Sequence, residues 1–240
     1  MTKTLRLLLL TAAVAGAALG GAAGALACGN RTGYSYAGIG AAAPASGISA
    51  IISPLNAFDI VNGHVAGWVG VGGPGEGPGG TNEWLQIGYS GFAGITGSDI
   101  YYEVAKPGRV PTYHQVAAAL PIGTVSKVAV LELHNRPDWW RVWLNRKPVS
   151  APIYLPESHD RFVPIATAES WDGGTGGTCN TFLYRFRRVK VAHAPGGDWH
   201  WLTGGSSISS SVTRVQRPRG AATFLAAEGQ SAFQFLSFTP

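Results

Sequence analysis

The sequence has few of the features that build metal sites, membrane spans and helical domains. Only 13% of its 240 residues are charged, and it contains one methionine and two cysteines that lie far apart. None of the six histidines has the H-x-x-x-H or H-x-H spacing typical of a metal site. After the first 27 residues no apolar run is long enough to span a bilayer, and no 3.6-residue apolar pattern indicates a domain-building helix. We therefore expect no metal, no membrane span and no helical core.

The first 27 residues have the pattern of a secretory signal peptide. Lys3 and Arg6 precede an apolar stretch, and Ala25-Leu26-Ala27 fits a small-x-small cleavage site. Two alternatives are a membrane span and a lipid anchor on Cys28, although Leu26 lies one position too close to that cysteine for a lipoprotein signal. We expect residues 1–27 to be removed and the mature chain to be secreted. Residues 28–35 would form an N-terminal segment and residues 36–240 a single domain.

The two cysteines are Cys28 and Cys179, an even number in a chain that is expected to enter an oxidising compartment. One disulfide bond is the direct interpretation, and in the chain-entropy model a loop of this length contributes about 4 to 5 kcal/mol. The alternatives are two unpaired thiols, or a lipid-modified Cys28 that leaves Cys179 alone.

The charge of the chain is mildly basic. The net charge of +5 falls to +3 when the two basic residues of the leader are removed. Four basic residues cluster near residue 187, but strand alternation sends them in pairs to opposite faces: Arg185 and Arg187 to one, Arg188 and Lys190 to the other. This pattern predicts no basic stripe, and we expect no nucleic-acid partner.

The composition favours an all-β fold. The 34 glycines and 15 prolines are typical of many short strands joined by turns. Ten segments have the character of strands: 49–53, 64–71, 83–89, 100–104, 125–134, 139–145, 163–171, 182–191, 222–226 and 232–238. Ten strands in one domain need two packed sheets to bury their apolar faces, so we predict a two-sheet antiparallel β-sandwich.

Alternation along three of these segments gathers polar and aromatic side chains on one sheet face. The apolar residues of 83–89 belong in the core, which leaves Trp84 and Gln86 on the other face. The same argument places Glu169 and Trp171 outward on 163–171 and Trp68 outward on 64–71. An amide that donates and a carboxylate that accepts form a minimal pair for activating water.

These residues belong to short motifs that are similar, in type and in order, to those of the glutamic peptidases, also called eqolisins. The resemblance extends from Tyr36 to Phe238, and Gln86 and Glu169 correspond to the catalytic glutamine and glutamate of the family. The motifs are Tyr36-Ala37-Gly38, Trp68-Val69-Gly70-Val71-Gly72-Gly73, Leu85-Gln86-Ile87-Gly88, Tyr101-Tyr102-Glu103, Ala168-Glu169 and Phe186-Arg187-Arg188-Val189.

The resemblance implies a β-sandwich related to concanavalin-like lectins, with a substrate groove on one sheet. It also implies hydrolysis of the peptide bonds of a polypeptide substrate at acid pH, without metal or cofactor. We expect the protein to be a monomer. Glu169 would act as general base and then as acid, and Gln86 would hold the water and donate to the oxyanion. The groove would be shaped by Trp68, Trp84, Tyr102 and Trp171.

The chain departs from the family at two positions that are usually acidic, where it has Gly72 and Ser90. A second hypothesis is therefore an inactive sandwich whose aromatic groove binds peptide or glycan. Other hydrolases have less support, because G-x-S-x-G is absent and a retaining glycosidase needs a second nearby carboxylate. Glu83 is predicted on the opposite face from Glu169, and Glu103 would face away if Tyr102 lines the groove.

Overall fold

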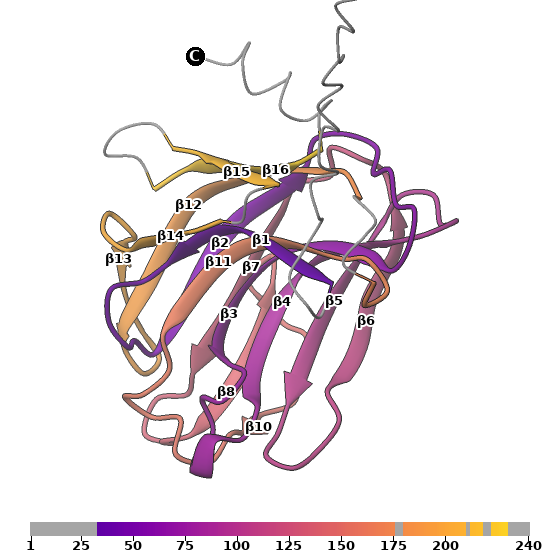
Figure 1. Ribbon diagram of the computed structural model, residues 1–240. Coiled ribbons are helices and arrows are strands. Elements are labelled where there is room, and N and C mark those ends of the chain that lie inside the picture. The colour runs from indigo at the N-terminus through magenta and orange to yellow at the C-terminus, as the bar shows by residue number, and fades with distance from the viewer. Residues whose placement is uncertain (1–32, 176–179, 210–211, 218–221, 230–240) are drawn as a thin grey trace, which may run out of the picture.

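The computed structural model describes residues 33–175, 180–209, 212–217 and 222–229, and in this part of the chain β-strands dominate. The strands form two antiparallel sheets that pack face to face (Figure 1). The first sheet has the order β14 (Ser206–Ser209), β1 (Tyr34–Gly40), β11 (Pro164–Trp171), β3 (His64–Gly73), β4 (Glu83–Phe92), β5 (Ser98–Ala105) and β6 (Thr112–Leu120).

The second sheet lies behind the first in Figure 1 and continues to β15 and β16 at the top of that view. Its main path is β10 (Ile153–Tyr154), β8 (Trp139–Leu144), β7 (Ser126–Glu132), β2 (Gly47–Pro54), β12 (Phe182–Ala194), β16 (Phe224–Glu228) and β15 (Thr213–Gln216). Two further strands pair at its side, β13 (Gly197–Trp201) with β12 and β9 (Lys147–Pro148) with β8. A single 3-10 turn, η1 (Pro78–Gly80), precedes β4.

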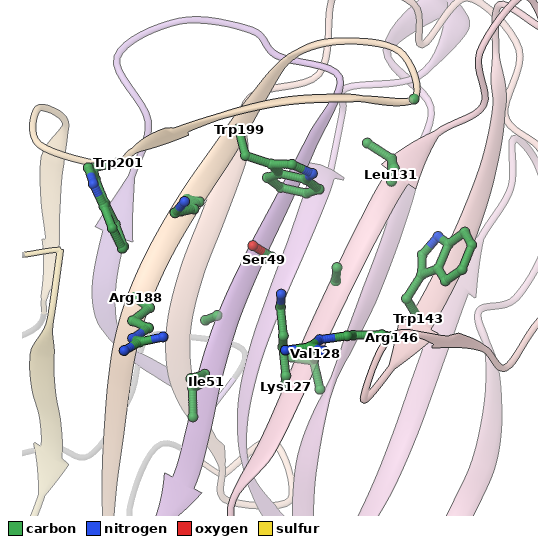
Figure 2. Close-up of a pocket in the computed structure, with 14 residues that line it drawn as sticks. Ser49, Ile51, Lys127, Val128, Leu131, Trp143, Arg146, Arg188, Trp199 and Trp201 are labelled. Carbon is green, nitrogen blue, oxygen red and sulfur yellow. The ribbon is translucent and has the colours of Figure 1, made fainter.

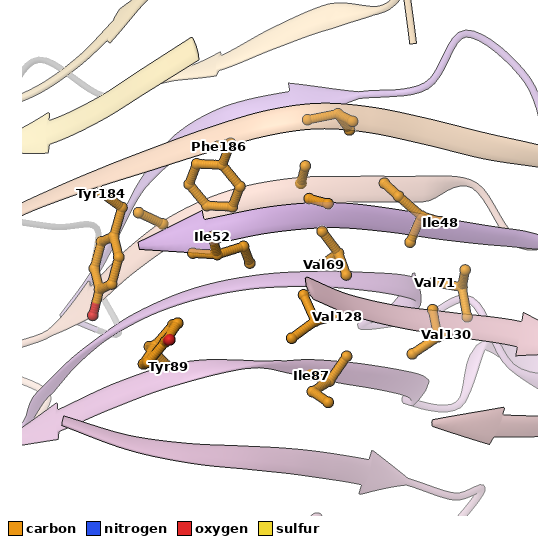
Figure 3. Packing of buried hydrophobic residues seen from close by; sticks show 14 of the residues in the cluster. Ile48, Ile52, Val69, Val71, Ile87, Tyr89, Val128, Val130, Tyr184 and Phe186 are labelled. Carbon is orange, nitrogen blue, oxygen red and sulfur yellow. The ribbon is translucent and has the colours of Figure 1, made fainter. Parts of the chain in front are cut away.

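The core lies between the two sheets and takes alternate residues from each. Val69 of β3 and Ile87 of β4 face Ile48 of β2 and Val128 of β7, and all four are fully buried (Figure 3). Burying one such aliphatic side chain contributes about 1.5 to 3 kcal/mol. Because successive strand residues point to opposite faces, the residues between these positions on β3, β4 and β11 point out of the sandwich. That outer face of the first sheet holds the candidate site.

The predicted antiparallel β-sandwich is confirmed, although several strands were not predicted. Nine of the ten predicted segments lie on strands, and 232–238 falls outside the described residues. The strands missed include β1 and β6, the second of which carries three consecutive alanines that have low strand propensity.

The leader, Cys28 and Cys179 also lie outside the described residues. Within the described ranges, no helix has the length and hydropathy needed to cross a membrane.

A bulge in β12 corrects the prediction that its basic residues divide between two faces. Arg187 pairs with Ile51 and Lys190 pairs with Ser49, so three steps along β12 match two steps along β2. The extra residue places Lys190 on the same face as Arg187, because their partners Ile51 and Ser49 share a face. Arg185, Arg187 and Lys190 therefore all point to the outer face of the second sheet. Alternation in a regular strand could not reveal this, since the bulge is invisible in the sequence pattern.

Candidate functional site

Gln86 and Glu169 both point outward from the first sheet, on the two strands that flank β3. Gln86 pairs with Gly70 and Glu169 pairs with Ala66, so they lie four positions apart along β3. In a flat sheet this offset and two strand spacings correspond to about 16 Å between their Cα atoms. Each of the two residues is only 7% exposed. Each of the two side chains is therefore held by its own set of neighbours.

Tyr101 of β5 is the hydrogen-bond partner of Gln86. The Gln86 amide Nε2 donates to the Tyr101 hydroxyl at 2.9 Å, and the Tyr101 ring stacks on Tyr113 with 4.9 Å between ring centres. Burial raises the pKa of Tyr101 well above its usual value, and the nearby charge of Glu169 raises it further. Because the hydroxyl oxygen accepts from Gln86, its proton remains to be donated. Tyr101 thus contacts the amide and lies within electrostatic reach of the carboxylate.

Glu169 is surrounded by aromatic rings and one histidine. His64 Nε2 lies 3.6 Å from the Glu169 carboxylate oxygen, and Tyr36 lies directly opposite Glu169 on β1. Burial, followed by the charge of Glu169, raises the pKa of Tyr36 well above its usual value and that of Tyr34 to about 12. Both phenols are therefore neutral neighbours. The protonated form of His64 would supply the matching positive charge.

Glu103 of β5 lies on the same face, directly opposite Gln86. The Trp84 indole Nε1 donates to a Glu103 oxygen at 2.8 Å. Burial raises the pKa of Glu103, the Trp84 hydrogen bond opposes this, and the charge of Glu169 adds to it. The outer face of the first sheet therefore carries Glu169, which is buried, and Glu103, which is partly buried and lies beside Gln86.

The predicted place of Tyr102 is wrong, and so is the expectation that Glu103 faces away. Tyr102 pairs with Ile87, points to the core side of the first sheet and stacks on His114 at 4.4 Å between ring centres. It cannot share a groove with Gln86 while the β4–β5 register holds. Alternation links Tyr101 with Glu103, but the choice of face depends on the register between strands, which the sequence pattern does not contain.

The three predicted tryptophans lie on the same outer face as Gln86 and Glu169. Trp68 pairs with Thr167 and Gly88 between the two residues and is 9% exposed. Trp84 lies beyond Gln86, and Trp171 lies beyond Glu169, where its ring is 5.7 Å from that of His64. The predicted role of these rings in substrate binding is not tested by their position. The histidine beside Glu169 was not predicted as part of a site.

Gly88 of β4 allows the side chains of Trp68 and Tyr101 to lie close together on the outer face of the first sheet. A Cβ atom at Gly88 would overlap the carbonyl oxygen of Gly67 and lie 2.6 Å from the Trp68 Cα. Only a residue without a side chain permits this close approach of β3 and β4. Trp68 and Tyr101 pack together with Ala66 in a cluster of their own on the outer face.

The two positions that are usually acidic in the family have structural roles here. Gly72 has a φ of +76°, and a Cβ atom there would overlap the carbonyl oxygen of Glu83. The Ser90 hydroxyl shares a 2.9 Å hydrogen bond with that of Tyr113, the ring that stacks on Tyr101. Glu83 points to the core side of the first sheet, away from Glu169, as alternation predicts.

Gln86 and Glu169 have little exposure to solvent, while residues around them such as His64 and Trp171 are half-buried. Neither of two cavities found in the described residues is lined by Gln86 or Glu169. Among those residues, no cluster of three or more histidine, cysteine, aspartate or glutamate side chains is arranged to hold a metal ion. The chemistry that the arrangement offers is that of buried carboxylates, an amide and a phenol: proton transfer and hydrogen bonding to a neutral or developing anionic oxygen.

Comparisons with known proteins give a result only at the level of structure. No family model matches the chain, and no curated protein sequence matches it. A scytalido-glutamic peptidase in complex with a peptide-based transition state analogue has a TM-score of 0.57 and 16% identity, with 81% of this chain and 98% of that chain covered. SCP-B, an eqolisin in complex with the tripeptide Ala-Ile-His, has a TM-score of 0.57, 15% identity and the same coverage. The predicted likeness is confirmed for the fold: this chain has the β-sandwich of the eqolisin glutamic peptidases.

Proposed function

We propose that this protein is a metal-independent acid endopeptidase that uses Gln86 and Glu169 as its catalytic pair. The observation that carries the proposal is that these two residues, which match the catalytic pair of the eqolisin motifs, both lie on the outer face of the first sheet of an eqolisin-like sandwich. Both are buried there. The solved relatives bind a peptide-based analogue and a tripeptide, which fits a polypeptide substrate for this chain.

In the proposed reaction Glu169 takes a proton from a water molecule whose oxygen attacks the carbonyl carbon of the substrate. The carbonyl oxygen becomes an oxyanion, and Gln86 donates an amide N–H to it. Glu169 then returns the proton to the leaving nitrogen as the C–N bond breaks. One oxyanion donor lowers a barrier of this kind by about 3 to 4 kcal/mol.

Tyr101 has a supporting role in this proposal. Its hydroxyl accepts from the Gln86 amide at 2.9 Å and thereby fixes which way the amide points. Its proton is left to donate to the water or to the oxyanion, and its raised pKa keeps the phenol neutral while it does so. In this proposal the Tyr101 hydroxyl adds a second donor beside the Gln86 amide.

The alternative is a catalytically inactive sandwich that binds peptide or glycan. The observations that favour it are the low exposure of Gln86 and Glu169, at 7% each, and their offset along β3. In this case the tryptophans of the outer face would bind a ligand without any water activation.

A digestion assay separates the two proposals. The mature protein is incubated with an unfolded protein substrate from acid to neutral pH, with and without a metal chelator. The peptidase proposal expects cleavage that is strongest at acid pH and unaffected by the chelator. If no peptide bond is cut at any pH while the protein stays folded, the binding module is the correct description.

We also propose that the chain is exported, with its leader removed after Ala27 and with Cys28 paired to Cys179. The basis is the leader pattern of the sequence. N-terminal sequencing and intact mass of the exported protein test both parts. Export is contradicted if the leader remains attached, and the disulfide if both thiols react with an alkylating agent without prior reduction.

A further inference from the structure

A second feature lies on the opposite side of the sandwich from Gln86 and Glu169. The outer face of the second sheet carries an open cavity of about 760 Å³, which we call the basin (Figure 2). Its floor includes Ser49 and Ile51 of β2 and Ala129 of β7, and its sides come from β8, β12 and β13. A volume of this size is typical of ligand sites.

Three tryptophans stand around the basin. Trp199 and Trp201 come from β13 and Trp143 from β8, on the other side of the floor, as Figure 2 shows. Trp201 is 50% exposed, so part of its ring surface is open to the basin. These rings offer flat apolar surfaces to a molecule that enters the basin.

Four cations also line the basin, and no acidic residue does: Lys127, Arg146, Arg188 and Lys190. Within the described ranges, none of the four takes part in an ion pair. The β12 bulge contributes to this concentration of charge, because it returns Lys190 to the outer face. Arg188 occupies the bulge itself, with a φ of +52°, and its side chain is exposed. The charges of the basin therefore complement an anionic ligand.

The floor of the basin restricts how a ligand can be held. β2, β7 and β12 each pair with a strand on both sides, so their backbone groups are already hydrogen-bonded. A peptide cannot add to them as an extra strand, and recognition must come from side chains alone. The ligand must therefore present negative charges and flat apolar surfaces together.

Lys190 and Trp201 show how close the negative charge and the flat apolar surface of the ligand must be to each other. The Lys190 ammonium lies over one face of the Trp201 ring, 4.3 Å from its centre, so a positive charge lies beside the part of the ring that stays exposed. In a uronic acid the carboxylate is bonded directly to the sugar ring, which matches this spacing. In a nucleotide the base and the phosphate are separated by the ribose, and the match is poorer.

We propose that the basin binds an acidic polysaccharide, with sugar rings packed on the tryptophans and carboxylates bound by the lysines and arginines. This site is separate from the candidate catalytic centre and does not depend on peptidase activity. A chain molecule suits an open basin on a sheet face better than a small enclosed ligand does.

The test measures binding of polygalacturonate to the purified protein by titration calorimetry, with dextran as the neutral polymer. We expect binding of polygalacturonate alone, and binding that weakens as salt is added. Arg188→Ala and Trp201→Ala should each weaken it about tenfold, since each removes one charged or stacking contact. Arg109→Ala is the matched control, because Arg109 is an exposed cation in the β5–β6 loop, outside the basin. It should leave the affinity unchanged.

Several results would overturn the proposal. These are an absence of polygalacturonate binding, an equal response to dextran, or an affinity that neither basin variant changes. Tighter binding of a single-stranded oligonucleotide or of polyglutamate would assign the basin to nucleic acid or to acidic protein instead. The Glu169→Gln variant should bind polygalacturonate like the wild type, so failure of the peptidase proposal leaves this result intact. Circular dichroism of each variant identifies any loss of fold.

Discussion

At the scale of single residues, Tyr101 is the side chain on which the candidate centre depends. We predict that Tyr101→Phe lowers the free energy of unfolding by about 1 to 3 kcal/mol, because the buried Gln86 amide loses its acceptor. Urea denaturation measures this. Tyr102→Phe is the matched control, since that ring faces the other side of the first sheet and its hydroxyl bonds to no described residue. The interpretation is contradicted if the two variants lose equal stability.

Two buried carboxyl groups make stability depend on pH. Burial raises the pKa of Glu83 and of Glu228 to about 7, and a hydrogen bond from Ser35 only partly opposes this for Glu228. An unfolded glutamate has a pKa of about 4.3, so the folded protein binds more protons between that value and about 7. The stabilisation is complete below the unfolded pKa and is lost as pH rises through about 7.

We therefore predict that the free energy of unfolding falls between about pH 4.5 and about pH 8, which would suit the proposed acid peptidase. Urea unfolding across this range gives the slope. Glu83→Gln should flatten it, because a neutral amide replaces the group that titrates. A stability that is constant or rises over this range would mean that these carboxyl groups are ionised in the folded protein.

At the scale of elements, the pairing of β3 with β4 positions the candidate centre, and Gly88 sets how closely the two strands approach. We predict that Gly88→Ala destabilises the fold by about 1 to 3 kcal/mol, because the added methyl group meets the backbone of Gly67 and Trp68. Gly204→Ala is the control, since no atom lies within 4 Å of a Cβ atom built there. Thermal unfolding compares the two, and equal melting temperatures would refute the close-packing explanation.

Element-scale features also mark the limit of prediction from sequence. Alternation places Gln86, Glu169 and three tryptophans on one face, because β3, β4 and β11 are regular strands. Alternation fails at β12, where one extra residue moves Lys190 to the face opposite the predicted one. It also fails at β5, where the pairing with β4 decides whether Tyr101 or Tyr102 lies on the outer face. Bulges and register are set by contacts between strands. A pattern within one strand therefore cannot reveal the cation-lined basin or the place of Tyr101.

At the scale of the whole molecule, the sandwich was predictable because its signals are distributed over the chain. Glycine, proline and two-residue alternation recur in almost every segment, so single misread strands such as β6 do not change the architecture. The candidate catalytic pair was found from the motif order. His64 and Tyr101 were not, because His64 approaches Glu169 only when the distant strands β3 and β11 pair, and the contact of Tyr101 with Gln86 depends on the β4–β5 register.

The two outer faces of the sandwich carry separate proposed functions, which gives a prediction about the whole molecule. Substitutions in the basin and in the candidate centre should act independently, because the core of the sandwich separates them. The Arg188→Ala and Tyr101→Phe effects on the free energy of unfolding should therefore add in the double variant. Urea denaturation of the four proteins of the cycle measures this, and a clear departure from additivity would show coupling between the faces.

The most direct measurement of the central claim is the rate of acid cleavage of an unfolded protein by Glu169→Gln. The matched control is Glu76→Gln, an exposed glutamate in the loop before β4. If Glu169 activates the water, its variant stays folded and loses cleavage by at least about a hundredfold, as expected for removal of a general base, while the control cleaves like the wild type. Cleavage by folded Glu169→Gln at the wild-type rate would contradict the proposed catalytic pair.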